Sequence, residues 1–244
     1  MTPAYILHQR PYRESSLLLE VFSRDAGRLA LVARGIKRGR QRKSGLMQSF
    51  TPLLLSWAGR GELFTLTDVE AAGAVLPLTG AVMLSGFYLN ELLLRLLQQH
   101  DPHEELFHAY ALAIQRLASK PASMAWTLRL FEKALLQELG YGLLLEQEAC
   151  SDRAVQADLV YCYHLQQGPM MAEVAANNGP LLHGSTLLAL ANEQNADERV
   201  LLEAKTLMRA ILAQYLGPRP LRSRELFRQL EAGKKSQANA AHEE

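Results

Sequence analysis

The chain has 244 residues, of which 48% are hydrophobic, so it can bury a substantial core and is not a disordered protein. Its 26 basic and 25 acidic residues nearly cancel, but residues 1–80 hold eleven basic and only six acidic side chains, a balance that suits a polyanionic partner. Two cysteines and a start without a signal-peptide pattern argue against an exported disulfide protein, so we expect a cytoplasmic one.

Residues 4–69 carry the pattern of β-strands, in which short β-rich runs alternate with turn residues. The expected strands are 5–8, 16–22, 29–33, 51–57 and 63–69. Gly27 supplies the positive φ that a tight reversal between the second and third strands needs. Five short strands in so short a segment favour a small closed barrel, because closure removes exposed strand edges.

After Pro77 the hydrophobic period changes from two to that of a helix. The expected helices are 80–99, 103–118, 124–139, one from an N-cap at Asp197 to a stop at Gly217, and a short one capped by Ser223. The apolar run 82–97 is interrupted by Asn90, Glu91 and Arg95, so it fits an amphipathic helix and not a membrane span.

These patterns predict an α+β protein with an N-terminal barrel followed by a mainly α-helical domain. We assign residues 1–78 to the barrel domain and residues 79–233 to the helical domain, with an irregular insertion around 141–180, where periodicity is lost. Residues 234–244 form a polar tail that we expect to be disordered.

Six cations without a single acid stand within ten residues between the third and fourth strands. They are Arg34, Lys37, Arg38, Arg40, Arg42 and Lys43. A loop of this kind suits a phosphate backbone, since each cation that neutralises a phosphate releases a condensed counterion. The alternative is a solvated loop that only aids solubility. Further cations in hairpin turns, Arg24, Arg28 and Arg60, are candidates for the same basic face.

Two other groups of residues are candidates for nucleic-acid contact. A second basic group consists of Arg219, Arg222, Arg224 and Arg228, and its alternative is a solvated C-terminal helix docked through its apolar residues. Four aromatic residues of the barrel segment offer rings for base stacking, with core packing as the alternative; they are Tyr12, Phe22, Trp57 and Phe64.

Arg129 lies among apolar neighbours, where a groove would hold an apolar peptide end with its carboxylate on the guanidinium. The alternative is an arginine whose stem is buried and whose head reaches water. Zinc ligation by the cysteines and nearby histidines is disfavoured by their scattered spacing. The acids are spread singly along helices and no phosphate-cradling glycine motif occurs, so the sequence does not favour an enzyme.

Several segments, taken in order, resemble the RecO family of bacterial recombination mediators and DNA-repair proteins. They are residues 7–19, 27–35, 48–55, 88–93, 131–142 and 220–228, the last reading Pro-Leu-Arg-Ser-Arg-Glu-Leu-Phe-Arg. The resemblance implies an oligonucleotide-binding (OB) type of barrel joined to a helical domain, with no enzymatic turnover and no cofactor. It also implies location in the cytoplasm with the nucleoid, and no association with membranes.

RecO-like proteins bind single- and double-stranded DNA, anneal complementary strands coated by single-strand-binding protein, and act with RecR to load the RecA recombinase. The resemblance places DNA binding on the basic loop that begins at Arg34. It also implies a pocket in the helical domain that receives the acidic tail of single-strand-binding protein, with Arg129 as the residue that best matches the position of this pocket. Some members carry a four-cysteine zinc module, but this chain has only Cys150 and Cys162, so we predict no metal.

Two functions of other classes compete with this interpretation. One is an OB-type adaptor that binds nucleic acid or a peptide without annealing strands. The other is a nuclease whose carboxylate site only the fold assembles.

Overall fold

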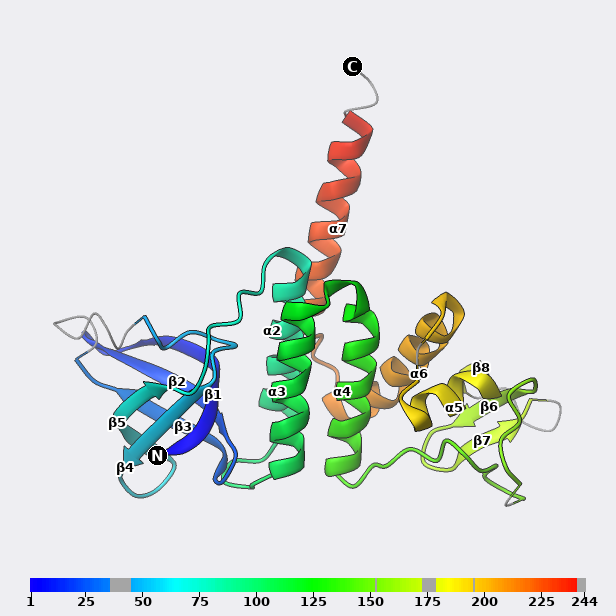
Figure 1. The fold of residues 1–244 in the computed structure, drawn as a ribbon, viewed down its shortest axis with the longest axis horizontal. Helices are drawn as coiled ribbons and strands as arrows, with labels where there is room; N and C mark the ends of the chain where they lie inside the picture. Colours follow the sequence, from blue (N-terminus) through cyan, green and yellow to red (C-terminus); the bar gives the residue numbers. More distant parts are fainter. Residues whose placement is uncertain (36–44, 152, 173–178, 195, 241–244) are drawn as a thin grey trace. The chain divides into compact units, whose positions relative to one another are not determined.

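The computed structural model describes residues 1–35, 45–151, 153–172, 179–194 and 196–240. Its N-terminal strands are β1 (Thr2–Tyr12), β2 (Ser16–Ser23), β3 (Gly27–Ala33), β4 (Leu53–Ala58) and β5 (Leu63–Ala71). They close into a barrel in the order β1-β2-β3-β5-β4 (Figure 1). Neighbouring strands are antiparallel except β3 and β5, which are parallel. The prediction of a five-stranded barrel followed by helices is confirmed.

The interior of the barrel is filled by alternate side chains of its strands. Ile6, Leu19, Leu31 and Leu53 are all fully buried there, and each side chain of this size contributes about 1.5–3 kcal/mol when it leaves water. Strand β1 is longer than predicted, because its polar second half pairs with the apolar start of β2 across a tight turn.

A β-bulge in β1 couples the barrel to the helices α2 (Gly80–Leu96) and α3 (Glu104–Ser119). The β1–β2 register shifts between Ile6 and His8, so Leu7 is the extra residue. The Leu7 carbonyl accepts a hydrogen bond from Asn90 Nδ2 at 2.8 Å, and the Tyr110 hydroxyl donates to Asn90 Oδ1 at 2.6 Å. Burial raises the pKa of Tyr110, which stays a neutral donor. A polar side chain in α2 thus bonds both neighbouring elements.

Gly27 makes the reversal between β2 and β3, as predicted. Its φ is +65°, and a Cβ at this position would lie 2.1 Å from the carbonyl oxygen of Asp101. The His100 amide donates to the Arg28 carbonyl beside this contact. Gly27 is required here both for its backbone conformation and for the space it leaves.

The chain groups into two compact units, residues 1–121 with 219–244 and residues 122–218. The predicted domain boundary at residue 78 stays a prediction. The second unit contains the end of a 3₁₀ turn η2 (Pro121–Ser123), the helices α4 (Met124–Glu138), α5 (Gly184–Asn192) and α6 (Glu198–Leu216), and a three-stranded sheet. That sheet has the order β7-β6-β8, from β6 (Val160–His164), β7 (Gly168–Met171) and β8 (Leu181–His183).

Part of the segment 141–180, expected to be irregular, therefore forms strands β6 and β7. Their length of five and four residues is too short for a two-residue period to be visible in the sequence. Helix α6 begins as predicted, because Asp197 Oδ1 accepts a hydrogen bond from the Val200 amide at 2.8 Å, and it ends at Gly217.

The last helix differs from its expected bounds. Helix α7 (Arg222–Ala240) belongs to the first unit and continues through the end of the expected short helix into the expected polar tail. Ser223 lies inside helix α7, and the N-terminus of this helix is capped by a residue of α2, as described below. Glu, Ala, Lys and Gln predominate after residue 230, and these residues have high helix propensity.

Candidate nucleic-acid interface

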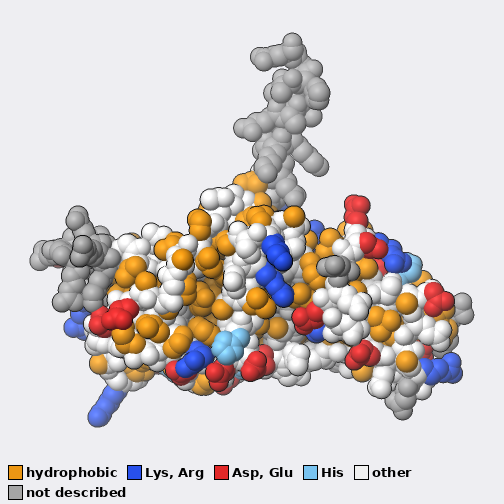
Figure 2. All heavy atoms as spheres, in the orientation of Figure 1, with side chains coloured by type: hydrophobic (Ala, Val, Ile, Leu, Met, Phe, Trp, Pro, Cys, Tyr) orange, Lys and Arg blue, Asp and Glu red, His pale blue; other side chains and the backbone are white. Residues whose placement is uncertain are grey.

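The face of the molecule that Figure 2 draws does not show one large region of a single charge. In Figure 2, Lys and Arg side chains are interspersed with Asp and Glu over the face that is drawn. Any accumulation of positive charge must therefore be found from the strand register and from the ion pairs of each cation.

The predicted DNA-binding loop leaves the barrel at the end of β3. Arg34 follows this strand directly and is exposed. The other cations of the loop lie outside the described residues: Lys37, Arg38, Arg40, Arg42 and Lys43. Their assignment stays a prediction, and the structure locates the point of the barrel from which the loop departs.

The same end of the barrel carries the turn between β1 and β2. Leu17 of β2 pairs with Ala33 of β3, so the start of β2 lies beside the end of β3. Two exposed arginines lie at this turn, Arg10 near the end of β1 and Arg13 in the turn itself. The predicted first strand ended at residue 8, so neither arginine was a predicted site residue; the pairing of residues 9–12 with β2 becomes visible only in the structure.

The hairpin cations Arg24 and Arg28 lie at the other end of β3. Arg34 lies six residue steps beyond Arg28, which is about 20 Å at roughly 3.3 Å per step along a strand. Arg28 binds Glu20 at 3.1 Å and donates to the Leu97 carbonyl at 3.2 Å. Arg24 binds Asp25 at 2.6 Å, and this hydrogen bond lowers the pKa of the Asp25 carboxyl. Both cations are thus already compensated within the protein.

Arg60 lies in the turn between β4 and β5, where it is exposed. Because β5 runs parallel to β3 with Leu63 beside Ala30, this turn is nearer to Arg28 than to Arg34. The structure therefore does not gather the hairpin cations and Arg34 at one end of the barrel.

The second basic group surrounds the start of α7. The Glu91 carboxylate of α2 accepts hydrogen bonds from the Arg222 and Ser223 amides at 2.9 and 3.0 Å, and from the Ser223 hydroxyl at 2.6 Å. It caps the helix in the way Ser223 was expected to. The Arg224 guanidinium lies 5.7 Å from the centre of the Tyr88 ring, while the Arg219, Arg222 and Arg228 side chains are exposed. Arg224 thus contributes to docking the helix.

Arg129 is buried in the second unit, only 7% exposed. One of its terminal nitrogens binds Glu132 Oε1 at 2.6 Å, three residues along α4, while its Nε has no hydrogen-bond partner among the described residues. An incoming carboxylate would compete with Glu132 for this guanidinium. Its role in tail binding stays a prediction.

The second unit also contains a cavity of about 230 Å³. The Tyr141 and Tyr215 rings stack beside it with centroids 3.9 Å apart. Its lining is neutral: Gly140, Tyr141, Gly142, Leu143, Leu144, Tyr163, Leu165, Gln166, Gln167, Gly168, Ile211, Gln214 and Tyr215. Burial raises the pKa of Tyr163 to about 12, so this ring is uncharged too. Without a charged side chain, the cavity offers no ion pair to a carboxylate or a phosphate.

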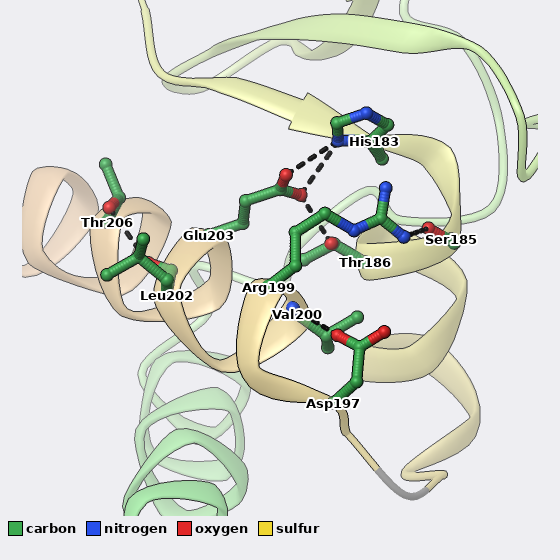
Figure 3. Close-up of polar contacts among 9 residues, drawn as sticks. All are labelled: His183, Ser185, Thr186, Asp197, Arg199, Val200, Leu202, Glu203 and Thr206. Atoms are coloured by element: carbon green, nitrogen blue, oxygen red, sulfur yellow. Dashed lines mark hydrogen bonds and ion pairs between the residues drawn. The ribbon is translucent and has the colours of Figure 1, made fainter.

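A polar cluster around Glu203 ties α6 to β8 and α5 (Figure 3). Glu203 accepts hydrogen bonds from the His183 amide at 2.9 Å and the Thr186 hydroxyl at 2.5 Å, and its carboxylate lies 2.6 Å from His183 Nδ1. Partial burial opposes ionisation of Glu203, but these hydrogen bonds outweigh it and lower its pKa. The cluster is a structural joint between three elements.

The potential metal ligands of the sequence do not converge. Cys162 is buried in β6, 3.6 Å from the Gly179 carbonyl, whereas Cys150 is exposed. Over the described ranges, no three His, Cys, Asp or Glu residues lie close enough to hold a metal ion.

A closed five-stranded barrel with exposed arginines at one end, continued by helices, defines the chain as an OB-type barrel protein. Two family models match it, "Recombination protein O N terminal" over residues 1–75 and "Recombination protein O C terminal" over residues 79–225. The chain therefore belongs to the RecO family of DNA repair proteins.

Individual relatives match almost end to end. The DNA repair protein RecO of Nitrosococcus oceani is 49% identical over 230 residues, which cover 94% of this chain and 93% of the relative. That of Alkalilimnicola ehrlichii is 50% identical over 230 residues, covering 93% and 90%. That of Dechloromonas aromatica is 45% identical over 231 residues, covering 94% and 95%. In the part of the chain that is described, no helix is long and apolar enough to cross a membrane.

Proposed function

We propose that this chain is a recombination mediator in DNA repair that works by binding and without catalytic turnover. It binds single- and double-stranded DNA, anneals complementary strands coated by single-strand-binding protein, and helps RecR to load RecA. The observation that carries the proposal is membership of the RecO family along nearly the whole chain, together with a barrel whose exposed arginines lie where the basic loop departs.

The mechanism is electrostatic. Two complementary strands repel each other through their phosphates, and cations at the loop screen this repulsion, so the strands approach and base pairing supplies the driving force. Binding of the acidic tail of single-strand-binding protein to the second unit, with Arg129 as the predicted carboxylate ligand, brings the mediator to coated DNA.

Strand annealing tests this function. Two complementary oligonucleotides with donor and acceptor dyes are coated with single-strand-binding protein, and energy transfer is followed with and without the protein, in the absence of nucleotide. We expect faster annealing with the protein, and a loss of this effect when Lys37, Arg38, Arg40 and Arg42 are changed to Gln together. Binding without acceleration would favour an adaptor, and divalent-dependent cleavage of the strands would favour a nuclease.

A further inference from the structure

The barrel's arginines differ in whether a carboxylate already compensates them. Arg24 and Arg28 form ion pairs, as described above. Arg10, Arg13 and Arg34 are exposed, and none of them forms an ion pair with a described residue. One acid, Glu14, lies in the same turn. The end of the barrel that carries the β1–β2 turn thus has an uncompensated positive charge.

The strand register places Arg10 and Tyr12 on the outer face of the barrel. Leu19 and Leu31 fill the interior, so their neighbours Leu18 and Val32 face outward. Arg10 pairs directly with Leu18, which pairs in turn with Val32, and these three residues form one row across β1, β2 and β3. The row ends two residues before Arg34.

The Tyr12 ring lies on this outer face beside the two exposed arginines. It packs against the small apolar cluster of Leu18, Ala30 and Val32, which supports one side of it. The Arg13 guanidinium lies 5.3 Å from the centre of the ring. Arg13 has a φ of +53°, a left-handed conformation that is uncommon for a residue other than glycine. The turn holds a ring and a guanidinium together at the surface.

The other three candidate rings pack against neighbouring side chains of the first unit. Phe22 is fully buried, with its ring centroid 5.6 Å from that of Phe107. Phe64 makes an edge contact with His100, and Trp57 packs against the barrel core. Of the four candidate rings, Tyr12 is the one that lies beside two exposed arginines without an ion pair among the described residues. Trp57 and Phe64 lie in the strands that flank the turn with the single exposed Arg60.

We propose that Tyr12, Arg10 and Arg13 form a contact point for one unpaired nucleotide of single-stranded nucleic acid. The base takes the place of Arg13 over the Tyr12 ring, and the two guanidinium groups neutralise the flanking phosphates. This inference rests on the proposed function and deepens it, because it assigns strand preference to particular residues. Bases within a duplex are already stacked on one another, so Tyr12 selects single strands, while the arginines bind either form.

The test is equilibrium binding of a fluorescent thymidine oligonucleotide and of a duplex, by anisotropy at several salt concentrations. We expect Tyr12→Leu to lower single-strand affinity on the order of 5- to 150-fold, from the cost of losing one stacked base, and to leave duplex affinity unchanged. Tyr12→Phe, which keeps the ring, retains the affinity of the parent. The double change Arg10→Gln with Arg13→Gln lowers the single-strand log-log salt slope by about 1.4, at roughly 0.7 for each contact.

The matched control is Arg153→Gln, which removes an exposed arginine from the second unit. A parent protein that binds neither nucleic acid overturns both this inference and the proposed function. A parent that binds single strands, with Tyr12→Leu and the double arginine variant no weaker than the control, overturns this inference alone. Thermal unfolding of each variant shows whether the barrel is intact. If it is intact, an equal loss of single-strand and duplex affinity in Tyr12→Leu also overturns this inference.

Discussion

The buried amide of Asn90 is expected to hold the barrel onto its helices. Asn90→Ala deprives the bulged Leu7 carbonyl and the Tyr110 hydroxyl of the group to which each is bonded, at 2.8 and 2.6 Å. Asn90 is 2% exposed, so water does not replace the amide without local opening. At about 0.5–1.5 kcal/mol for each of the two lost hydrogen bonds, the free energy of unfolding should fall by about 1–3 kcal/mol.

The assay is urea unfolding followed by tryptophan fluorescence. The chain has two tryptophans, Trp57 in β4 and Trp126 in α4. In a Trp126→Phe background the signal reports the barrel unit alone, which avoids treating two compact units as one transition. Tyr110→Phe, which removes one of the two hydrogen bonds, serves as the intermediate variant. If Asn90→Ala lies within about 0.5 kcal/mol of its parent, the argument for this joint is refuted.

Gly27→Ala should destabilise the barrel by more than about 2 kcal/mol, because its Cβ meets the Asp101 carbonyl; Gly35→Ala, with positive φ but open space, should cost less in the same unfolding assay. The ionised Glu203 carboxylate stabilises the fold fully at pH values above its unfolded pKa of about 4.3, and this contribution is lost as the pH falls through its lower folded pKa. The difference in free energy of unfolding between the parent and Glu203→Gln should therefore close in acid. A difference that does not change with pH would contradict this. Glu132→Gln should tighten binding of the acidic tail peptide and Arg129→Ala should weaken it, as measured by calorimetry, because Glu132 competes for the guanidinium; a change of the same sign in both variants would rule out Arg129.

The sequence was sufficient to predict the barrel, because short β-rich runs separated by turn residues, such as the turn at Gly27, are local signals. The helix between Asp197 and Gly217 was predictable for the same reason, since its cap and its stop are single residues. Strands β6 to β8 were not, because each is at most five residues long and is specified by its neighbours in the sheet.

The site was predictable only in part. The charge of the basic loop is visible in the sequence, but the compensation of Arg28 by Glu20 depends on the pairing of β2 with β3. The ion pair between Arg129 and Glu132 was within reach, since residues three apart on a helix are neighbours. Arg10 and Arg13 could be recognised as site residues only from the register of β1 with β2, which the hydrophobic pattern does not reveal.

The most direct test of the account is to find where single-stranded DNA touches the intact protein. Photo-crosslinking of a thymidine oligonucleotide, followed by mass spectrometry of the linked peptides, gives this location without any substitution. We predict links within residues 10–13 and in the peptide that follows Ala33, all at one end of the barrel. Links confined to residues 122–218 would contradict the claim that this barrel end holds the nucleic acid.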